Sequence, residues 1–105
     1  MSDTKNVRVT LEYSARELMS AVLDNLLAAY VPQYSWDEIS TRATVRAMCP
    51  DTDEYKTYSV SASRLARGLS LALRDGAVSG DPWEWDAYDS YTVLQYALYG
   101  KLIYG

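Results

Sequence analysis

The sequence predicts a small α+β domain in which a small antiparallel sheet of about three strands is packed by three helices. Strands are expected over 6–13, 41–48 and 55–61, and apolar and polar residues alternate in the first two, as they do in half-buried strands. Apolar residues recur at helical intervals over 15–30, 62–75 and 86–99. The 105 residues contain no repeat, linker or low-complexity tract, so we expect one domain over 1–105 with the order β-α-β-β-α-α.

A capping signal separates the first strand from the first helix. Residues 7–13 alternate between apolar and polar side chains. Ser14 and Glu17 then match a capping box, in which each side chain binds the backbone N–H of the other residue. The helix is expected to run over 15–30 and to end before Pro32. Its apolar residues cover about half of the circumference, which predicts that this helix is the centre of the core.

The segment from 31 to 48 admits two interpretations. Residues 35–38 match a second capping box, which indicates a helix, whereas 41–48 alternates small apolar residues with threonine and arginine, which favours a strand. We expect one helical turn at 36–40, followed by a strand that pairs with 55–61 in a hairpin. The alternative is a longer helix with no hairpin.

The third helix, over 62–75, is expected to begin at Ser61 or Ser63 and to end at Gly76. One of its faces is apolar. The other face carries three arginines with a leucine among them, namely Arg64, Arg67, Leu71 and Arg74. A solvated face is the ordinary interpretation of such a pattern, and a contact surface is the alternative.

The last quarter of the chain contains more aromatic residues than one core face needs. Acidic residues begin the helix over 86–99, where the helix dipole favours them, and Gly100 is expected to end it in a left-handed conformation. The core side consists of Ala87, Tyr91, Leu94, Ala97 and Leu98. A second, tyrosine-rich side consists of Tyr88, Thr92, Gln95, Tyr96 and Tyr99. That side is either ordinary core, in a chain without phenylalanine, or a contact surface, because tyrosine is enriched in protein interfaces.

The composition excludes several classes of chemistry. The chain has no histidine and one cysteine, Cys49, so it cannot form a histidine-activated nucleophile, an internal disulfide or a structural zinc site. The five glycines are interpreted as isolated turn residues, and none belongs to a phosphate-binding loop. We therefore expect no catalytic residue, no metal and no cofactor.

Charge and hydropathy limit the partners and the location. A net charge of −4 and a pI near 4.6 argue against nucleic acid, whose general binding depends on neutralising phosphates. No apolar run is long enough to span a membrane. The first residues lack the apolar segment of a signal peptide, so we expect a cytoplasmic protein.

The last quarter combines spaced aspartates with the run Val93 to Gly100 and a final Tyr104-Gly105. This ending resembles small uncharacterised proteins encoded by bacteriophages of actinobacteria. The resemblance covers the last quarter, with Lys101 where an acid is expected, and the rest of the chain only in layout. It implies a cytoplasmic protein of the infected bacterial cell that acts on a host or defence protein, and it implies no catalytic residue.

The leading hypothesis is therefore a non-enzymatic protein–protein interaction module that forms a homodimer and binds a host protein. Its contact surface is expected on the last two helices, through the tyrosine-rich side of one and the arginine face of the other. The alternative is a small nucleic-acid-binding regulator that uses Arg64, Arg67 and Arg74. An enzyme is the third hypothesis, since the residue types give it the least support.

Overall fold

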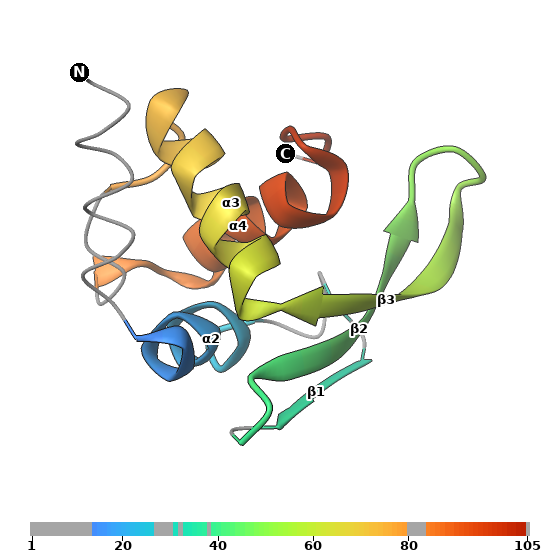
Figure 1. Cartoon of the computed structure of the whole chain (residues 1–105). Helices are drawn as coiled ribbons and strands as arrows, with labels where there is room; N and C mark the ends of the chain where they lie inside the picture. The colour runs from blue at the N-terminus through green and yellow to red at the C-terminus, as the bar shows by residue number, and fades with distance from the viewer. Residues whose placement is uncertain (1–13, 27–30, 32, 38, 80–83, 105) are drawn as a thin grey trace.

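The computed structural model of the chain describes residues 14–26, 31, 33–37, 39–79 and 84–104. Over these residues the chain forms a three-stranded antiparallel sheet and three helices in the order α-β-β-β-α-α, which confirms the α+β class (Figure 1). The strand predicted over 6–13 lies outside the described residues. Among the described residues, the sheet contains a strand in a segment for which the sequence predicted a helical turn.

Helix α2 (Ala15–Leu23) begins at the predicted capping box. The Ser14 hydroxyl accepts a hydrogen bond from the Glu17 backbone N–H at 3.1 Å, and the Glu17 carboxylate accepts one from the Ser14 N–H at 3.1 Å. These two bonds satisfy N–H groups that have no partner within the helix.

The end of α2 differs from the predicted range of 15–30. The helix stops at Leu23, and Asp24 is its C-cap. Asn25 then directs its side-chain amide to the backbone carbonyl of Trp85, at a donor–acceptor distance of 2.8 Å. Because this bond joins residues far apart in sequence, the helical periodicity of the segment could not reveal it.

The sheet consists of β1 (Gln33–Asp37), β2 (Arg42–Cys49) and β3 (Glu54–Ser61), paired in the order β1-β2-β3. Both pairings are antiparallel. The β2–β3 hairpin confirms the preferred interpretation, and the alternative of a longer helix without a hairpin is wrong.

The helical turn predicted at 36–40 is also wrong. Trp36 lies within β1 opposite Ala43, and Asp37 is the last residue of the strand. The Asp37 carboxylate accepts hydrogen bonds from the Ile39 N–H at 3.1 Å and the Ser40 hydroxyl at 3.0 Å. An aspartate that binds the backbone two residues later forms a turn, so the capping pattern here belongs to the connection between two strands.

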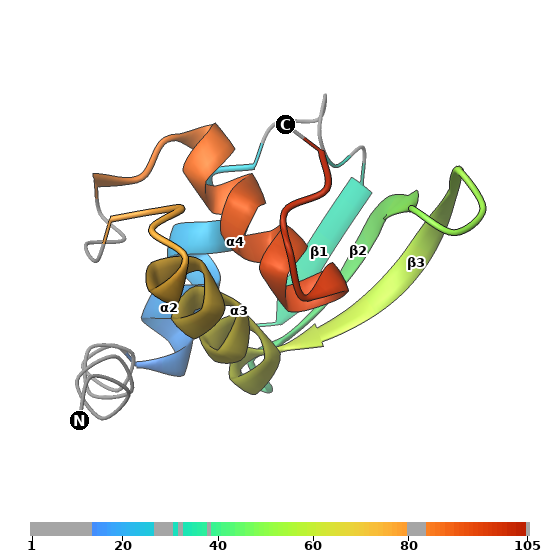
Figure 2. The ribbon, with the colours of Figure 1, turned by 90° about the horizontal axis from the view of Figure 1, so that it is seen from above.

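The helices lie on one side of the sheet, and no described element covers the other side (Figure 2). Successive side chains of the central strand point to opposite sides of the sheet, so every second one is buried beneath the helices. The buried residues of β2 are Ala43, Val45 and Ala47, and its exposed residues include Arg42, Thr44 and Arg46.

Helix α3 (Ala62–Arg74) has Ser61 as its N-cap, and Gly76 follows it with a positive φ of 70°. The interpretation of every glycine as a turn residue is wrong for Gly68, which lies in the middle of α3. A Cβ atom at this position would be 2.6 Å from the backbone nitrogen of Ala97. The glycine therefore permits close approach of α3 to the last helix.

Helix α4 (Ala87–Tyr99) begins with a capping box formed by Asp86 and Asp89, and it ends at Gly100 in the predicted left-handed conformation, with φ of 79°. Every residue from 90 to 97 is buried. The helix contacts α2, α3 and β3. The centre of the core is therefore α4, which corrects the prediction that the first helix occupies it.

Candidate functional site

A groove of about 520 Å³ lies between α3 and α4. It brings together residues that the sequence placed on two separate candidate surfaces, the arginine face of α3 and the tyrosine-rich side of α4. Its lining consists of Ser61, Ser63, Arg64, Arg67, Leu71, Tyr96, Ala97 and Gly100. The sequence did not indicate this meeting, because it depends on how closely the two helices approach each other at Gly68.

Arg64 does not present its charge to the solvent as an arginine face would require. Its Nε donates to the Ala97 carbonyl at 2.8 Å, its Nη2 to the Leu98 carbonyl at 3.3 Å and its Nη1 to the Ser59 carbonyl at 3.0 Å. The last carbonyls of a helix lack partners within the helix, and a cation there interacts favourably with the helix dipole. Arg64 therefore caps the end of α4 and joins it to α3.

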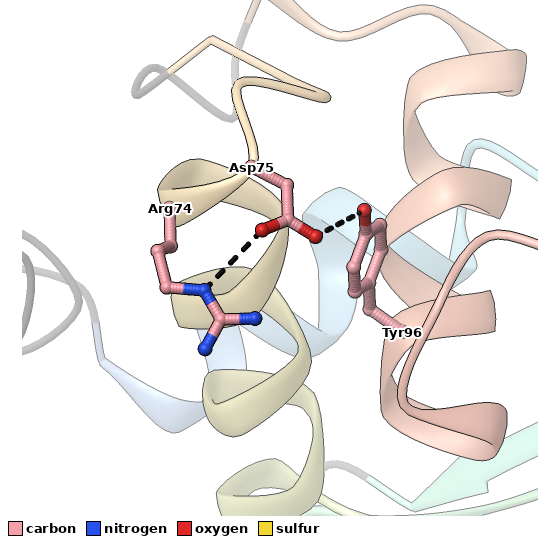
Figure 3. A network of polar contacts seen from close by, with 3 residues as sticks. All are labelled: Arg74, Asp75 and Tyr96. Atoms are coloured by element: carbon pink, nitrogen blue, oxygen red, sulfur yellow. Dashed lines mark hydrogen bonds and ion pairs between the residues drawn. The ribbon is translucent and has the colours of Figure 1, made fainter.

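Arg74 belongs to a second contact between the two helices, shown in Figure 3. The Tyr96 hydroxyl donates to one carboxylate oxygen of Asp75 at 2.9 Å, and Arg74 Nε lies 3.3 Å from the other oxygen. The hydrogen bond from Tyr96, followed by the pairing with Arg74, lowers the pKa of Asp75 below its ordinary value. The same hydrogen bond raises the pKa of Tyr96. The Arg74 side chain is 61% exposed, so its ion pair contributes little to stability.

Arg67 is the arginine of this face whose charge no described residue engages. The side chain is exposed and makes no ion pair or hydrogen bond with any residue that the structure describes. Leu71 lies one helical turn further along α3 and is half-buried in the groove. The predicted arginine face is thus reduced to Arg67 and Leu71, with the ring of Tyr96 on the opposite wall.

The tyrosine-rich side of α4 is largely inside the fold. The Gln95 side chain is fully buried and binds the backbone of the C-terminal segment. Its oxygen accepts from the N–H groups of Ile103 at 3.0 Å and Tyr104 at 2.7 Å, and its nitrogen donates to the Tyr104 carbonyl at 2.8 Å. Thr92 is also buried, and its hydroxyl donates to the Tyr88 carbonyl at 2.9 Å. These two polar side chains serve the fold and are not available to a partner.

The tyrosines of this side differ in exposure. Tyr96 is buried apart from its contact with the groove, while Tyr88 is 38% exposed. Tyr99 is half-buried, and its hydroxyl donates to the Met48 carbonyl. Its ring meets the Tyr58 ring edge to face, with centroids 6.1 Å apart and an angle of 79° between the planes. The expected contact surface on α4 is therefore confined to Tyr88 and the part of Tyr96 that faces α3.

A second depression, of about 400 Å³, lies between the β2–β3 turn and the end of α4. Cys49 lines it together with Tyr58. Hydrogen bonds from the Asp51 N–H and the Thr52 hydroxyl lower the pKa of the Cys49 thiol. Burial, followed by the hydrogen bond with Cys49, raises the pKa of Tyr58 to about 12. The thiol ionises more readily than usual, but the chain has no histidine that could activate it as a nucleophile.

The described ranges contain no group of three acidic or cysteine side chains that could hold a metal ion. Among their helices, none combines the length and the apolar character that crossing a membrane requires. Comparison of the chain with protein-family models, with curated proteins and with solved structures finds no match. The groove between α3 and α4 is therefore the candidate site on geometry alone.

Proposed function

We propose that this chain is a non-enzymatic protein-binding module that holds a segment of a partner protein in the groove between α3 and α4. The observation that carries the proposal is the groove itself, which is lined by Arg67, Leu71 and Tyr96, and no described residue engages the charge of Arg67. Arginine and tyrosine dominate the binding energy of many protein interfaces, where they surround apolar contacts that exclude water.

The lining of the groove indicates the chemistry of the partner. The Arg67 guanidinium can donate hydrogen bonds to a carboxylate or a backbone carbonyl of the partner, and the exposed Ser63 hydroxyl can donate or accept a further hydrogen bond. Leu71 and the Tyr96 ring offer apolar surface to a short aliphatic side chain. The Asp75 carboxylate already accepts from Tyr96 and Arg74, so it does not compensate the charge of Arg67. We expect a segment with one acidic and one apolar residue.

For the location and the source of the partner, the proposal rests on the resemblance of the last quarter to proteins of actinobacterial bacteriophages. We propose a host or defence protein of the infected cell, bound in the cytoplasm, and we propose that the module itself forms a homodimer. Nucleic acid receives less support. Arg64 and Arg74 are engaged within the chain, and the net charge is −4, so few phosphates could be neutralised.

The test compares affinity capture from an actinobacterial lysate by the parent, an Arg67→Glu variant and an Arg16→Glu variant. Arg16 is exposed on α2, so its substitution makes the same change of charge away from the groove. We expect one protein to be retained by the parent and by Arg16→Glu, and to be lost with Arg67→Glu. The purified pair should then show the same order of affinities by calorimetry.

Two results would contradict the proposal. One is a purified partner that binds Arg67→Glu as tightly as it binds the parent, because the groove would then not be the contact. The other is binding of the parent to an oligonucleotide with a steep dependence on salt, which would favour the nucleic-acid alternative.

A further inference from the structure

Strand β1 (Gln33–Asp37) is an edge of the sheet and pairs with β2 on one side only, as far as the structure describes the chain (Figure 1). Exposed edge strands attract a further strand unless proline, lysine or a bulge protects them. The five residues QYSWD contain neither proline nor lysine, and four of them are exposed. Ile39, immediately beyond the strand, is 92% exposed, the highest value for a large apolar side chain among the described residues.

We propose that β1 pairs antiparallel with β1 of a second copy of this chain, so that two sheets join into one of six strands. The symmetry axis passes through Ser35, which then lies opposite the same residue of the second copy. Tyr34 lies opposite Trp36 of the second copy, and Gln33 lies opposite Asp37. Each of these two pairs occurs twice. Cross-strand aromatic pairs stabilise antiparallel sheets, and the Gln33 amide can donate to the Asp37 carboxylate.

The position of the axis follows from the length of the strand. An axis at Ser35 pairs all five residues of β1 with β1 of the second copy. An axis at Tyr34 would place Trp36 opposite Pro32, which has no N–H to donate. In the register at Ser35, the end of β1 lies beside the start of the other β1, so Ile39 comes next to the second copy and away from solvent.

The exposed charges of the neighbouring strand complement this register. Arg46 lies beside Gln33 and Arg42 lies beside Asp37 within one copy. Across the joined sheet, the row of residues on the uncovered side becomes Arg46 and Gln33 of one copy followed by Asp37 and Arg42 of the other. Each carboxylate then lies in a row that contains arginines from both copies, and no two like charges are directly opposite.

This contact is separate from the groove proposed to bind a host protein. Strand β1 is at one edge of the sheet, and β3, from which α3 continues, is at the other (Figure 1). Loss of the dimer therefore leaves the groove intact, and an Arg67 variant leaves the β1 edge intact. The two proposals can fail independently.

The register is tested by cysteine cross-linking in a Cys49→Ser background, which removes the single native cysteine. Opposed side chains on antiparallel strands lie close to the separation that a disulfide needs. Mild oxidation should give a covalent dimer with Ser35→Cys. It should not do so with Gln33→Cys, because the residue opposite is Asp37 of the second copy. Equal cross-linking of both variants, or none with Ser35→Cys, would overturn the register.

The affinity of the dimer is tested by sedimentation equilibrium of two charge variants. Gln33→Lys faces Asp37 of the second copy and should tighten the dimer about tenfold, whereas Gln33→Asp should weaken it about tenfold. Within one copy the same residue neighbours Arg46, so the stability of the monomer should change in the opposite direction. A general effect on folding would change dimer affinity and monomer stability in the same direction, so opposite changes distinguish the proposed contact from such an effect.

Two outcomes would overturn the proposal. The parent and Gln33→Lys could both be monomeric throughout the concentration series, in which case another segment or another protein covers β1. Alternatively, the two variants could shift the dimer in the same direction, which a contact between Gln33 and Asp37 does not permit.

Discussion

Replacing Gly68 with alanine has two effects of opposite sign on the stability of the fold. In the interior of a helix, alanine is more favourable than glycine by about 1 kcal/mol. The new Cβ atom, however, would lie 2.6 Å from the backbone nitrogen of Ala97, 2.8 Å from its Cα and 2.9 Å from its Cβ. Contacts that short require α3 and α4 to separate, because two of the three atoms are backbone.

Overpacking of a core costs about 1–3 kcal/mol, and the backbone contact places Gly68→Ala near the upper limit. After subtracting the gain in helix propensity, we expect a net loss of about 2 kcal/mol in the free energy of unfolding. The assay is equilibrium unfolding in urea, followed by tryptophan fluorescence. Ser63→Ala, at an exposed position of the same helix, is the control and should change stability by less than about 0.5 kcal/mol.

A double variant sharpens the test. Adding Ala97→Gly removes the Cβ atom at 2.9 Å but leaves the nitrogen and the Cα in place, so it should not restore the stability of the parent. A Gly68→Ala variant more stable than the parent would contradict the close contact of α3 and α4 at Gly68, since helix propensity alone would then determine the change in stability.

Three further predictions concern other contacts of the fold. Arg64→Met removes the donors to three carbonyls and should cost about 2–3 kcal/mol in the same urea assay; Arg64→Lys should recover only part of this, and full recovery would contradict the capping role. Leu26 is buried in the core, so Leu26→Ala should cost about 2–5 kcal/mol, and a thermal melt identical to that of the parent would show that the segment after α2 is not packed as described. Because the pKa of Tyr58 is raised from 10.0 to about 12, its contribution to stability is complete below pH 10 and is lost as the pH rises toward 12. Between these pH values the free energy of unfolding from urea should fall less for Tyr58→Phe than for the parent, and an equal fall would contradict the raised pKa of Tyr58.

Local signals in the sequence were sufficient for much of the fold. The capping box at Ser14, the left-handed glycine at Gly100 and the alternation along 41–48 all act within a few residues, and the structure confirms each of them. The α+β class followed from these signals together. They are reliable here because each depends on neighbouring backbone groups and not on distant contacts.

The strand β1 could not be predicted, because a local signal and a distant pairing compete in the same segment. The pattern at 35–38 matches a capping box, yet the backbone of this segment gains more hydrogen bonds from β2 than one helical turn could supply. Asp37 then serves the turn that follows the strand.

The position of α4 at the centre of the core was hidden by its polar residues. Ser90 and Gln95 are buried because other parts of the chain supply their partners, as when the Ser90 hydroxyl donates to the Ala21 carbonyl at 3.0 Å. The buried Thr92 hydroxyl finds its partner within the helix, at the Tyr88 carbonyl. Hydrophobic periodicity assigns such polar residues to the solvent-facing side of a helix. For the same reason the tyrosine-rich side was expected to be available for contacts, whereas most of it is inside the fold.

The candidate site was predicted in its residues but not in its arrangement. The sequence indicated Arg67 and Leu71 on one helix and Tyr96 on another, and the structure places all three in one groove. It did not indicate that Arg64 binds the carbonyls of α4, because those partners are more than thirty positions away in the chain. Asp75 was missed for a similar reason, since its role depends on Tyr96.

Amide hydrogen exchange along α4 tests whether this helix is the buried centre of the fold. We expect the amides of residues 93–97 to exchange only when the whole domain unfolds, so that their exchange free energy equals the unfolding free energy from urea. Exchange of these amides through local opening, faster than that of α2, would contradict it.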